Sequence, residues 1–142
     1  MTMSPLDPGG TEREVLRRLE TILVVEDEVE VRRVVTLTLE HQGYRVISAA
    51  CAAEALDLAS SIDRPIDLLL TDVVMPQVSG KQLHDVLSAS TPELPVLYIS
   101  GYREEIVAVH GVAAHPGNFL AKPFAAAALG RKVRHLLRTT DN

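Results

Sequence analysis

The sequence predicts an α/β fold: a doubly wound, five-stranded parallel sheet with helices on both faces. Short apolar runs rich in β-branched residues alternate along the chain with stretches whose apolar residues recur at helical spacing. Five strands, each followed by a helix, imply a parallel sheet that is covered on both faces. The chain has 142 residues, 46% hydrophobic and 23% charged, which is enough to bury the core of one domain.

The strands are predicted from apolar runs that end in polar residues. Each run is short and reads as a buried strand. In chain order the runs are TILVVE (21–26), YRVISAA (44–50), IDLLLTD (66–72), PVLYIS (95–100) and NFLAK (118–122).

A helix is predicted after each strand from apolar residues three or four positions apart. Gly43 stops the first helical pattern. The fourth helix, over 104–112, has a poor apolar stripe. The apolar positions of the other four, in chain order, are Val31, Val34, Val35 and Leu39; Ala55, Leu56 and Ala59; Leu83, Val86 and Leu87; and Leu129, Val133, Leu136 and Leu137.

Three segments are expected along the chain. Residues 1–20 form a linker or N-terminal extension, because residues 1–10 contain two prolines and two glycines, and residues 11–20 are a candidate short helix. Residues 21–138 form the folded domain, and 139–142 are a C-terminal tail.

Composition excludes several classes of function. The net charge of −5, from 14 basic and 19 acidic residues, argues against nucleic-acid binding, which depends on phosphate neutralisation. The basic residues near the C-terminus are interpreted as the solvated face of the last helix. One cysteine, Cys51, excludes an internal disulfide and a cysteine metal cluster. The chain contains neither an apolar signal core nor a run of membrane-spanning length, so we expect a cytoplasmic location and no membrane contact.

Reactive side chains stand at the carboxyl ends of four predicted strands, where this architecture binds ligands. Glu26-Asp27 end the first strand, Asp72 the third, Ser100 the fourth and Lys122 the fifth. If the first and third strands are neighbours, about 4.8 Å apart, their carboxylates crowd together and require a cation. A hard-oxygen site of this kind favours Mg²⁺.

The other two strand ends suggest phosphoryl chemistry. The Ser100 hydroxyl and the Lys122 ammonium would hold the oxygens of a phosphoryl group. A carboxylate such as Asp72 can act as the nucleophile and form an aspartyl phosphate.

Together these motifs resemble the response regulator receiver domain of two-component signalling, the CheY-like family. The resemblance extends from about Thr21 to Arg138. It is carried by ILVVEDE, LLLTDVVMPQVSG, VLYISGY and NFLAKPF, in that order; Glu26 stands where many members have Asp.

The resemblance implies a strand order of 2-1-3-4-5 and a phosphoacceptor site. A histidine kinase or histidine phosphotransfer protein would transfer a phosphoryl group from phosphohistidine to Asp72. Catalytic roles fall to Asp72, Lys122 and Ser100, and the expected ligands of Mg²⁺ are Glu26, Asp27, Asp72 and the carbonyl of Val74.

The resemblance also implies a switch. Ser100 and Phe119 would reorient on phosphorylation and change the surface of the fourth helix, fifth strand and fifth helix. Gly80 follows in the loop after Asp72, the Lys122–Pro123 bond is expected to be cis, and Tyr102 is interpreted as a rim residue.

Simpler interpretations and other contexts stay open. Glu26-Asp27 could cap a helix, and Phe119 could be a core residue. The alternative functions are an unphosphorylated pseudo-receiver and an aspartyl-phosphate phosphohydrolase. We expect no enzyme activity beyond self-phosphorylation and autodephosphorylation. The favoured context is the C-terminal receiver of a hybrid histidine kinase, and a free single-domain regulator and a phosphate sink are the alternatives. A weak homodimer through residues 11–20 is a further candidate partner.

Overall fold

The protein folds around one five-stranded parallel sheet. The computed structural model describes residues 19–101 and 117–140. The strand order is β2-β1-β3-β4-β5 and all neighbouring pairs are parallel, which confirms the predicted topology. The strands are β1 (Thr21–Val25), β2 (Arg45–Ala49), β3 (Leu68–Asp72), β4 (Val96–Ser100) and β5 (Phe119–Ala121).

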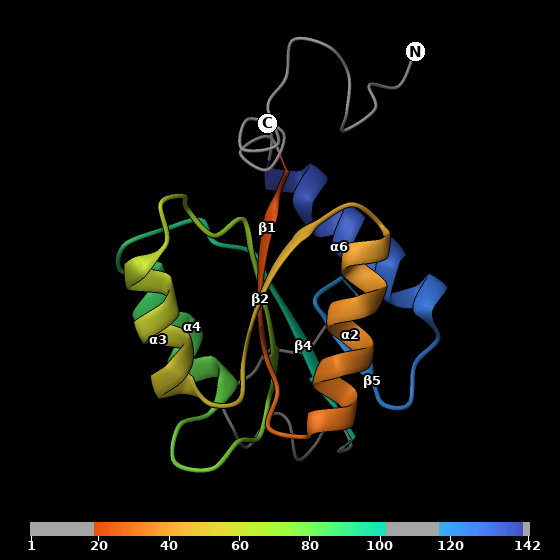
Figure 1. Ribbon diagram of the computed structural model, residues 1–142, viewed down its shortest axis with the longest axis horizontal. Coiled ribbons are helices and arrows are strands. Elements are labelled where there is room, and N and C mark those ends of the chain that lie inside the picture. Colours follow the sequence, from red (N-terminus) through yellow and green to blue (C-terminus); the bar gives the residue numbers. More distant parts are fainter. Residues whose placement is uncertain (1–18, 102–116, 141–142) are drawn as a thin grey trace, which may run out of the picture.

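Among the described residues, two helices cover each face of the sheet. Figure 1 shows α2 and α6 on one face, and α3 and α4 on the other. Their bounds are α2 (Val29–His41), α3 (Ala52–Ser61), α4 (Gly80–Ser88) and α6 (Ala126–Thr140). The expected helix over 104–112, the candidate helix over 11–20 and Tyr102 lie outside the described residues or extend beyond them.

The core lies on both sides of the three central strands. Every residue of β1, β3 and β4 is buried. Because side chains alternate along a strand, Ile22 and Val24 pack with α2 and α6, whereas Leu23 and Val25 pack toward α3 and α4. Each fully buried aliphatic side chain contributes about 1.5–3 kcal/mol of transfer free energy. The apolar runs are therefore held in the middle of the sheet.

The helical stripes were predicted correctly at most positions and wrongly at two. Val35 and Leu39 are buried on α2, as are Leu129 and Val133 on α6. Val34 and Val86 instead face outward, with 56% and 54% of their surface exposed.

A capping box starts α4. Ser79 accepts a hydrogen bond from the Gln82 backbone N–H at 3.2 Å, and the Gln82 side chain accepts one from the Ser79 N–H at 2.9 Å. This reciprocal pair satisfies two N–H groups that the first helical turn leaves free. The helix N-terminus, and with it the end of the loop after β3, is thereby fixed.

The parallel register brings the polar strand ends to one edge. Val25 pairs with Thr71, Asp72 with Ile99, and Ser100 with Ala121. The residues that follow β1 and β5 therefore lie beside Asp72 at the carboxyl edge of the sheet. The Lys122–Pro123 bond is cis, as expected.

Candidate functional site

Asp72 is the last residue of β3 and is almost fully enclosed, with 6% of its surface exposed. Its carboxylate is held on both oxygens. Oδ1 accepts a long hydrogen bond of 3.4 Å from the Val74 N–H, and Oδ2 lies 3.0 Å from the Lys122 ammonium. The strand end thus points one carboxylate toward a cation rather than toward bulk water.

The backbone around Asp72 is fixed by Thr71 and by the start of α4. The Thr71 hydroxyl donates to the Asp72 carbonyl at 3.0 Å. The Gly80 N–H donates to the Val73 carbonyl at 3.0 Å, and a Cβ at Gly80 would overlap the Asp72 carbonyl oxygen. Only a residue without a side chain allows the start of α4 to approach Asp72 this closely.

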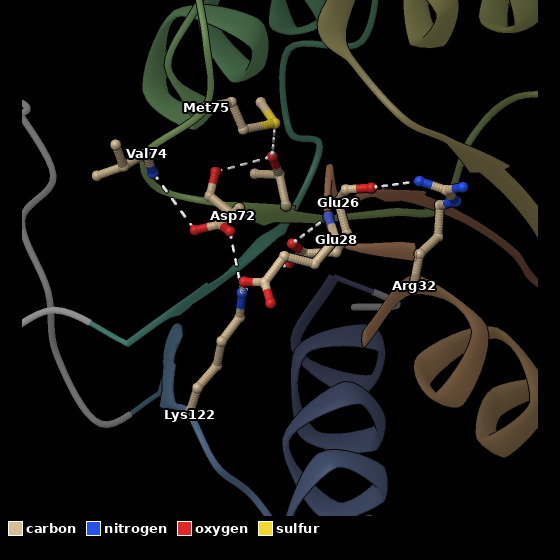
Figure 2. Close-up of polar contacts among 8 residues, drawn as sticks. Glu26, Glu28, Arg32, Asp72, Val74, Met75 and Lys122 are labelled. Atoms are coloured by element: carbon tan, nitrogen blue, oxygen red, sulfur yellow. Dashed lines mark hydrogen bonds and ion pairs between the residues drawn. The ribbon is translucent and has the colours of Figure 1, made fainter. Parts of the chain in front are cut away.

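Lys122 is the cation at the centre of the site. Its Nζ lies 2.9 Å from Glu26 Oε2, 3.0 Å from Asp72 Oδ2 and 3.3 Å from Glu28 Oε1. Figure 2 shows the lysine extending from the end of β5 toward these carboxylates. Burial by itself lowers the pKa of an ammonium, but the hydrogen bonds to Glu26 and Asp72 hold the pKa of Lys122 above its ordinary value.

Glu26 is an unusual buried acid. None of its surface is exposed, and desolvation raises its pKa from 4.5 to about 7, against the opposing effect of the Lys122 hydrogen bond. Glu26 Oε2 is paired with the Lys122 ammonium at 2.9 Å and, within the described residues, has no other partner. This oxygen is therefore suited to a further cation.

The turn between β1 and α2 carries three consecutive acids. The Glu26 N–H donates to the Ala49 carbonyl at 3.1 Å, and Glu26 Oε1 accepts from the Glu28 N–H at 3.0 Å. Arg32 Nη1 donates to the Glu26 carbonyl at 2.8 Å, as Figure 2 shows. The turn is thus held by β2 on one side and by α2 on the other.

Glu26, Asp27 and Asp72 fit a divalent metal ion. Each offers one carboxylate oxygen, and the three atoms lie within 4.8 Å of one another. Oxygen-only donors are the ligands that Mg²⁺ prefers. The buried and incompletely satisfied Glu26 oxygen independently supports a cation at this position.

The two proposed switch residues occupy β4 and β5. Ser100 is fully buried at the end of β4, and its carbonyl accepts from the Lys122 N–H at 2.8 Å. Phe119 begins β5 opposite Tyr98 and packs, half-buried, against the core on the α3–α4 face. Ser100 thus lies beside Lys122 at the carboxyl edge, whereas Phe119 begins β5 three residues before Lys122; the switching role of both residues stays a prediction.

Comparison with known proteins identifies the family. A profile described as the response regulator receiver domain matches residues 22–134. The chain belongs to this family. It is a receiver domain of the kind used in two-component signalling.

Two relatives illustrate the range of proteins that contain such domains. The receiver is 35% identical over 121 residues to the sensor kinase CckA of Brucella abortus, covering 85% of this chain and 13% of that protein. It is 38% identical over 119 residues to the response regulator MprA of Mycobacterium tuberculosis, covering 84% and 51% respectively. The chain thus spans about half or less of these relatives.

Solved structures agree with the fold. The receiver domain of the hybrid histidine kinase CckA has a TM-score of 0.68 at 38% identity, covering 82% of this chain and 98% of that one. A receiver protein from Sinorhizobium medicae has a TM-score of 0.74 at 31% identity, covering 85% and 96%.

Membership has general consequences. Receiver domains generally bind Mg²⁺ and interact with histidine kinases or phosphotransfer proteins, and the acidic cluster is suited to such an ion. Within the described ranges, no helix has the length and apolarity needed to cross a bilayer.

The main residues of the site were predicted from the sequence, but two residues that contact them, Glu28 and Arg32, were not. Glu28 was visible after the acidic pair, yet nothing in its spacing predicted an ion pair with Lys122, 94 residues away. The bond from Arg32 to the Glu26 carbonyl depends on how one helical turn folds back over the loop.

Proposed function

We propose that this receiver takes a phosphoryl group from a phosphohistidine onto Asp72. The observation that carries the proposal is the convergence of a nearly buried carboxylate, a lysine 3.0 Å away and an acidic pair with metal-ligand spacing. Groups arranged in this way bind and neutralise the oxygens of a transferring phosphoryl group.

The Asp72 carboxylate is the nucleophile. A carboxylate oxygen forms a bond to phosphorus while the phosphorus–nitrogen bond of phosphohistidine breaks, and the imidazole keeps that electron pair. The departing imidazole carries a proton on its other ring nitrogen or takes one from water, so the products are an acyl phosphate on Asp72 and a neutral histidine on the donor. Lys122 already contacts Asp72, so its ammonium is placed to follow the new phosphoryl oxygens.

Glu26, Asp27, Asp72 and the carbonyl of Val74 would hold Mg²⁺. The bound ion would neutralise the carboxylates and the phosphoryl oxygens that approach them. Glu26 must be ionised to serve as a ligand, and burial raises its pKa in the metal-free protein, so Mg²⁺ that binds below about pH 7 would displace a proton from Glu26.

Ser100 and Phe119 carry the proposed switch. Phosphorylation would draw the Ser100 hydroxyl to a phosphoryl oxygen, and Phe119 would move into the space left behind. The Lys122 N–H bond to the Ser100 carbonyl links the end of β5 to the end of β4. A change at the phosphoryl group therefore has a short path into β5. From there it would reach the surface formed by the helix predicted over 104–112, β5 and α6.

A groove beside the site supports docking of the phosphohistidine donor. It encloses about 420 Å³ between the start of α2 and the segment after β5, and Val31, Val34 and Phe124 form its apolar part. Lys122 forms part of its wall, so an apolar helix face lying in the groove would bring its phosphohistidine to Asp72. A histidine kinase or a histidine phosphotransfer protein provides such a helix.

The relatives favour a larger assembly. This chain corresponds to 13% of the sensor kinase CckA, and the CckA receiver domain is 38% identical to it. We infer that it acts as the receiver of a hybrid kinase in the cytoplasm.

Intact mass after incubation with acetyl phosphate tests the proposal. Wild type should gain one phosphoryl group only when Mg²⁺ is present, and Asp72→Asn should gain none. The matched control is Asp57→Asn, which removes an exposed carboxylate of α3 and should behave as wild type. Transfer from a phosphorylated histidine protein is measured in parallel. If folded wild type accepts no phosphoryl group from either donor, it is a pseudo-receiver and the proposal is wrong.

A further inference from the structure

Arg32 occupies a position that helix electrostatics do not favour. It lies near the beginning of α2, where the helix dipole is positive and a cation is disfavoured. The side chain is half-buried and turns back toward the end of β1, where Nη1 donates to the Glu26 carbonyl at 2.8 Å. A charge-assisted bond to a backbone carbonyl offsets the unfavourable location.

The carbonyl that Arg32 holds belongs to the peptide between Glu26 and Asp27. On the preceding side, the Glu26 N–H is bound to Ala49 of β2. On the following side, the Arg32 N–H donates to the Glu28 carbonyl at 2.9 Å. The orientation of the peptide between these two points sets the directions in which the Glu26 and Asp27 side chains leave the backbone.

We propose that Arg32 is a positioning residue for the metal site. By fixing the Glu26–Asp27 peptide it keeps both carboxylates turned toward Asp72, as their mutual spacing within 4.8 Å requires. Arg32 acts through these two residues and is not itself one of the three carboxylates that would hold the ion. The inference rests on the proposed function, because it assumes that the three carboxylates bind Mg²⁺.

A positioning role for Arg32 and a purely electrostatic effect of its charge predict opposite changes in Mg²⁺ affinity when Arg32 is replaced. An arginine near a cation site repels Mg²⁺, so removal of its charge alone would strengthen binding. Loss of the peptide's orientation would weaken binding, because the ligands must then be ordered by the ion itself. Arg33 provides the matched control, since it is the next residue of the same helix, carries the same charge and is exposed.

Titration calorimetry of Mg²⁺ binding at moderate ionic strength distinguishes the two effects. Arg32→Ala and Arg32→Met should each raise the Kd for Mg²⁺ about tenfold, the range typical for groups that orient metal ligands. Arg33→Ala should leave the Kd unchanged or slightly lower. Arg32→Lys should recover part of the loss, because its ammonium can reach the same carbonyl.

Each result decides the inference. If Arg32→Ala or Arg32→Met binds Mg²⁺ as tightly as Arg33→Ala, the positioning role is wrong. Circular dichroism checks folding; should Arg32→Ala fail to fold, Arg32→Met keeps the apolar stem and decides alone. If wild type binds no Mg²⁺, the metal part of the proposed function fails together with this inference. If wild type binds Mg²⁺ and Arg32→Met binds it with the same Kd, the positioning role of Arg32 is wrong but the metal part of the proposed function stands.

Discussion

Replacing Glu26 by Gln should change how the stability of the metal-free protein depends on pH. The folded state raises the pKa of Glu26 from 4.5 to about 7, so folded protein holds this proton more tightly than unfolded protein does. The stability associated with the proton is complete below pH 4.5 and is lost as pH rises to 7. At about 1.4 kcal/mol for each pKa unit, the difference between these values corresponds to roughly 3 kcal/mol.

Urea unfolding in chelator at several pH values between 4.5 and 7.5 measures this effect. The free energy of unfolding of wild type, relative to Glu26→Gln, should fall across this range, because the neutral amide keeps the shape of the side chain but has no proton to lose. Glu40→Gln, which changes an exposed carboxylate of α2, should follow wild type. If the free energy of unfolding of wild type stays level or rises relative to that of Glu26→Gln between pH 5 and 7, the conclusion that burial raises the pKa of Glu26 is refuted.

Three further substitutions test the support of the site. Gly80→Ala should lower the free energy of urea unfolding by about 1–3 kcal/mol and suppress phosphorylation, because the new Cβ would overlap the backbone of Asp72. Gly130→Ala is its control, since its Cβ meets only the movable side chain of Gln42, and its unfolding free energy should change by less than about 1 kcal/mol. Ser79→Ala should lower the free energy of urea unfolding by about 1 kcal/mol through loss of the capping box. Lys122→Met should slow phosphorylation by acetyl phosphate about 10²–10³-fold, because one charged donor to the phosphoryl group is lost; an unchanged rate would remove Lys122 from the mechanism.

The strands were predictable because burial on both faces leaves a strong local signal. The run LLLTD is apolar until its last two residues and forms β3 with every residue buried. The carboxyl-edge placement of Asp72 and Lys122 then follows from parallel topology, which places all strand ends of one kind together. The capping box at Ser79 and Gln82 was not predicted, although Ser-x-x-Gln before an apolar pattern is a signature of a helix start.

The remaining features depend on tertiary geometry. Val34 has helical spacing with Val31 yet faces outward, since a stripe's spacing does not specify which of its borders meets the sheet. The contacts of Lys122 with Glu28, and of Arg32 with the Glu26 carbonyl, use long side chains with many rotamers. Such partners are selected by the assembled site rather than by spacing along the chain.

The position of the phosphoryl group on the protein decides whether Asp72 is the phosphoacceptor. Borohydride converts an acyl phosphate into an alcohol, so reduction of the phosphorylated protein marks the modified carboxylate as a new hydroxyl residue. Trypsin separates Asp72 from the acids after β1, because Arg32 and Arg33 lie between them. The expected result is a homoserine at position 72 after treatment with acetyl phosphate and Mg²⁺, and none when Mg²⁺ is left out. A mark at Asp27 or Glu26, with Asp72 unchanged, would contradict it.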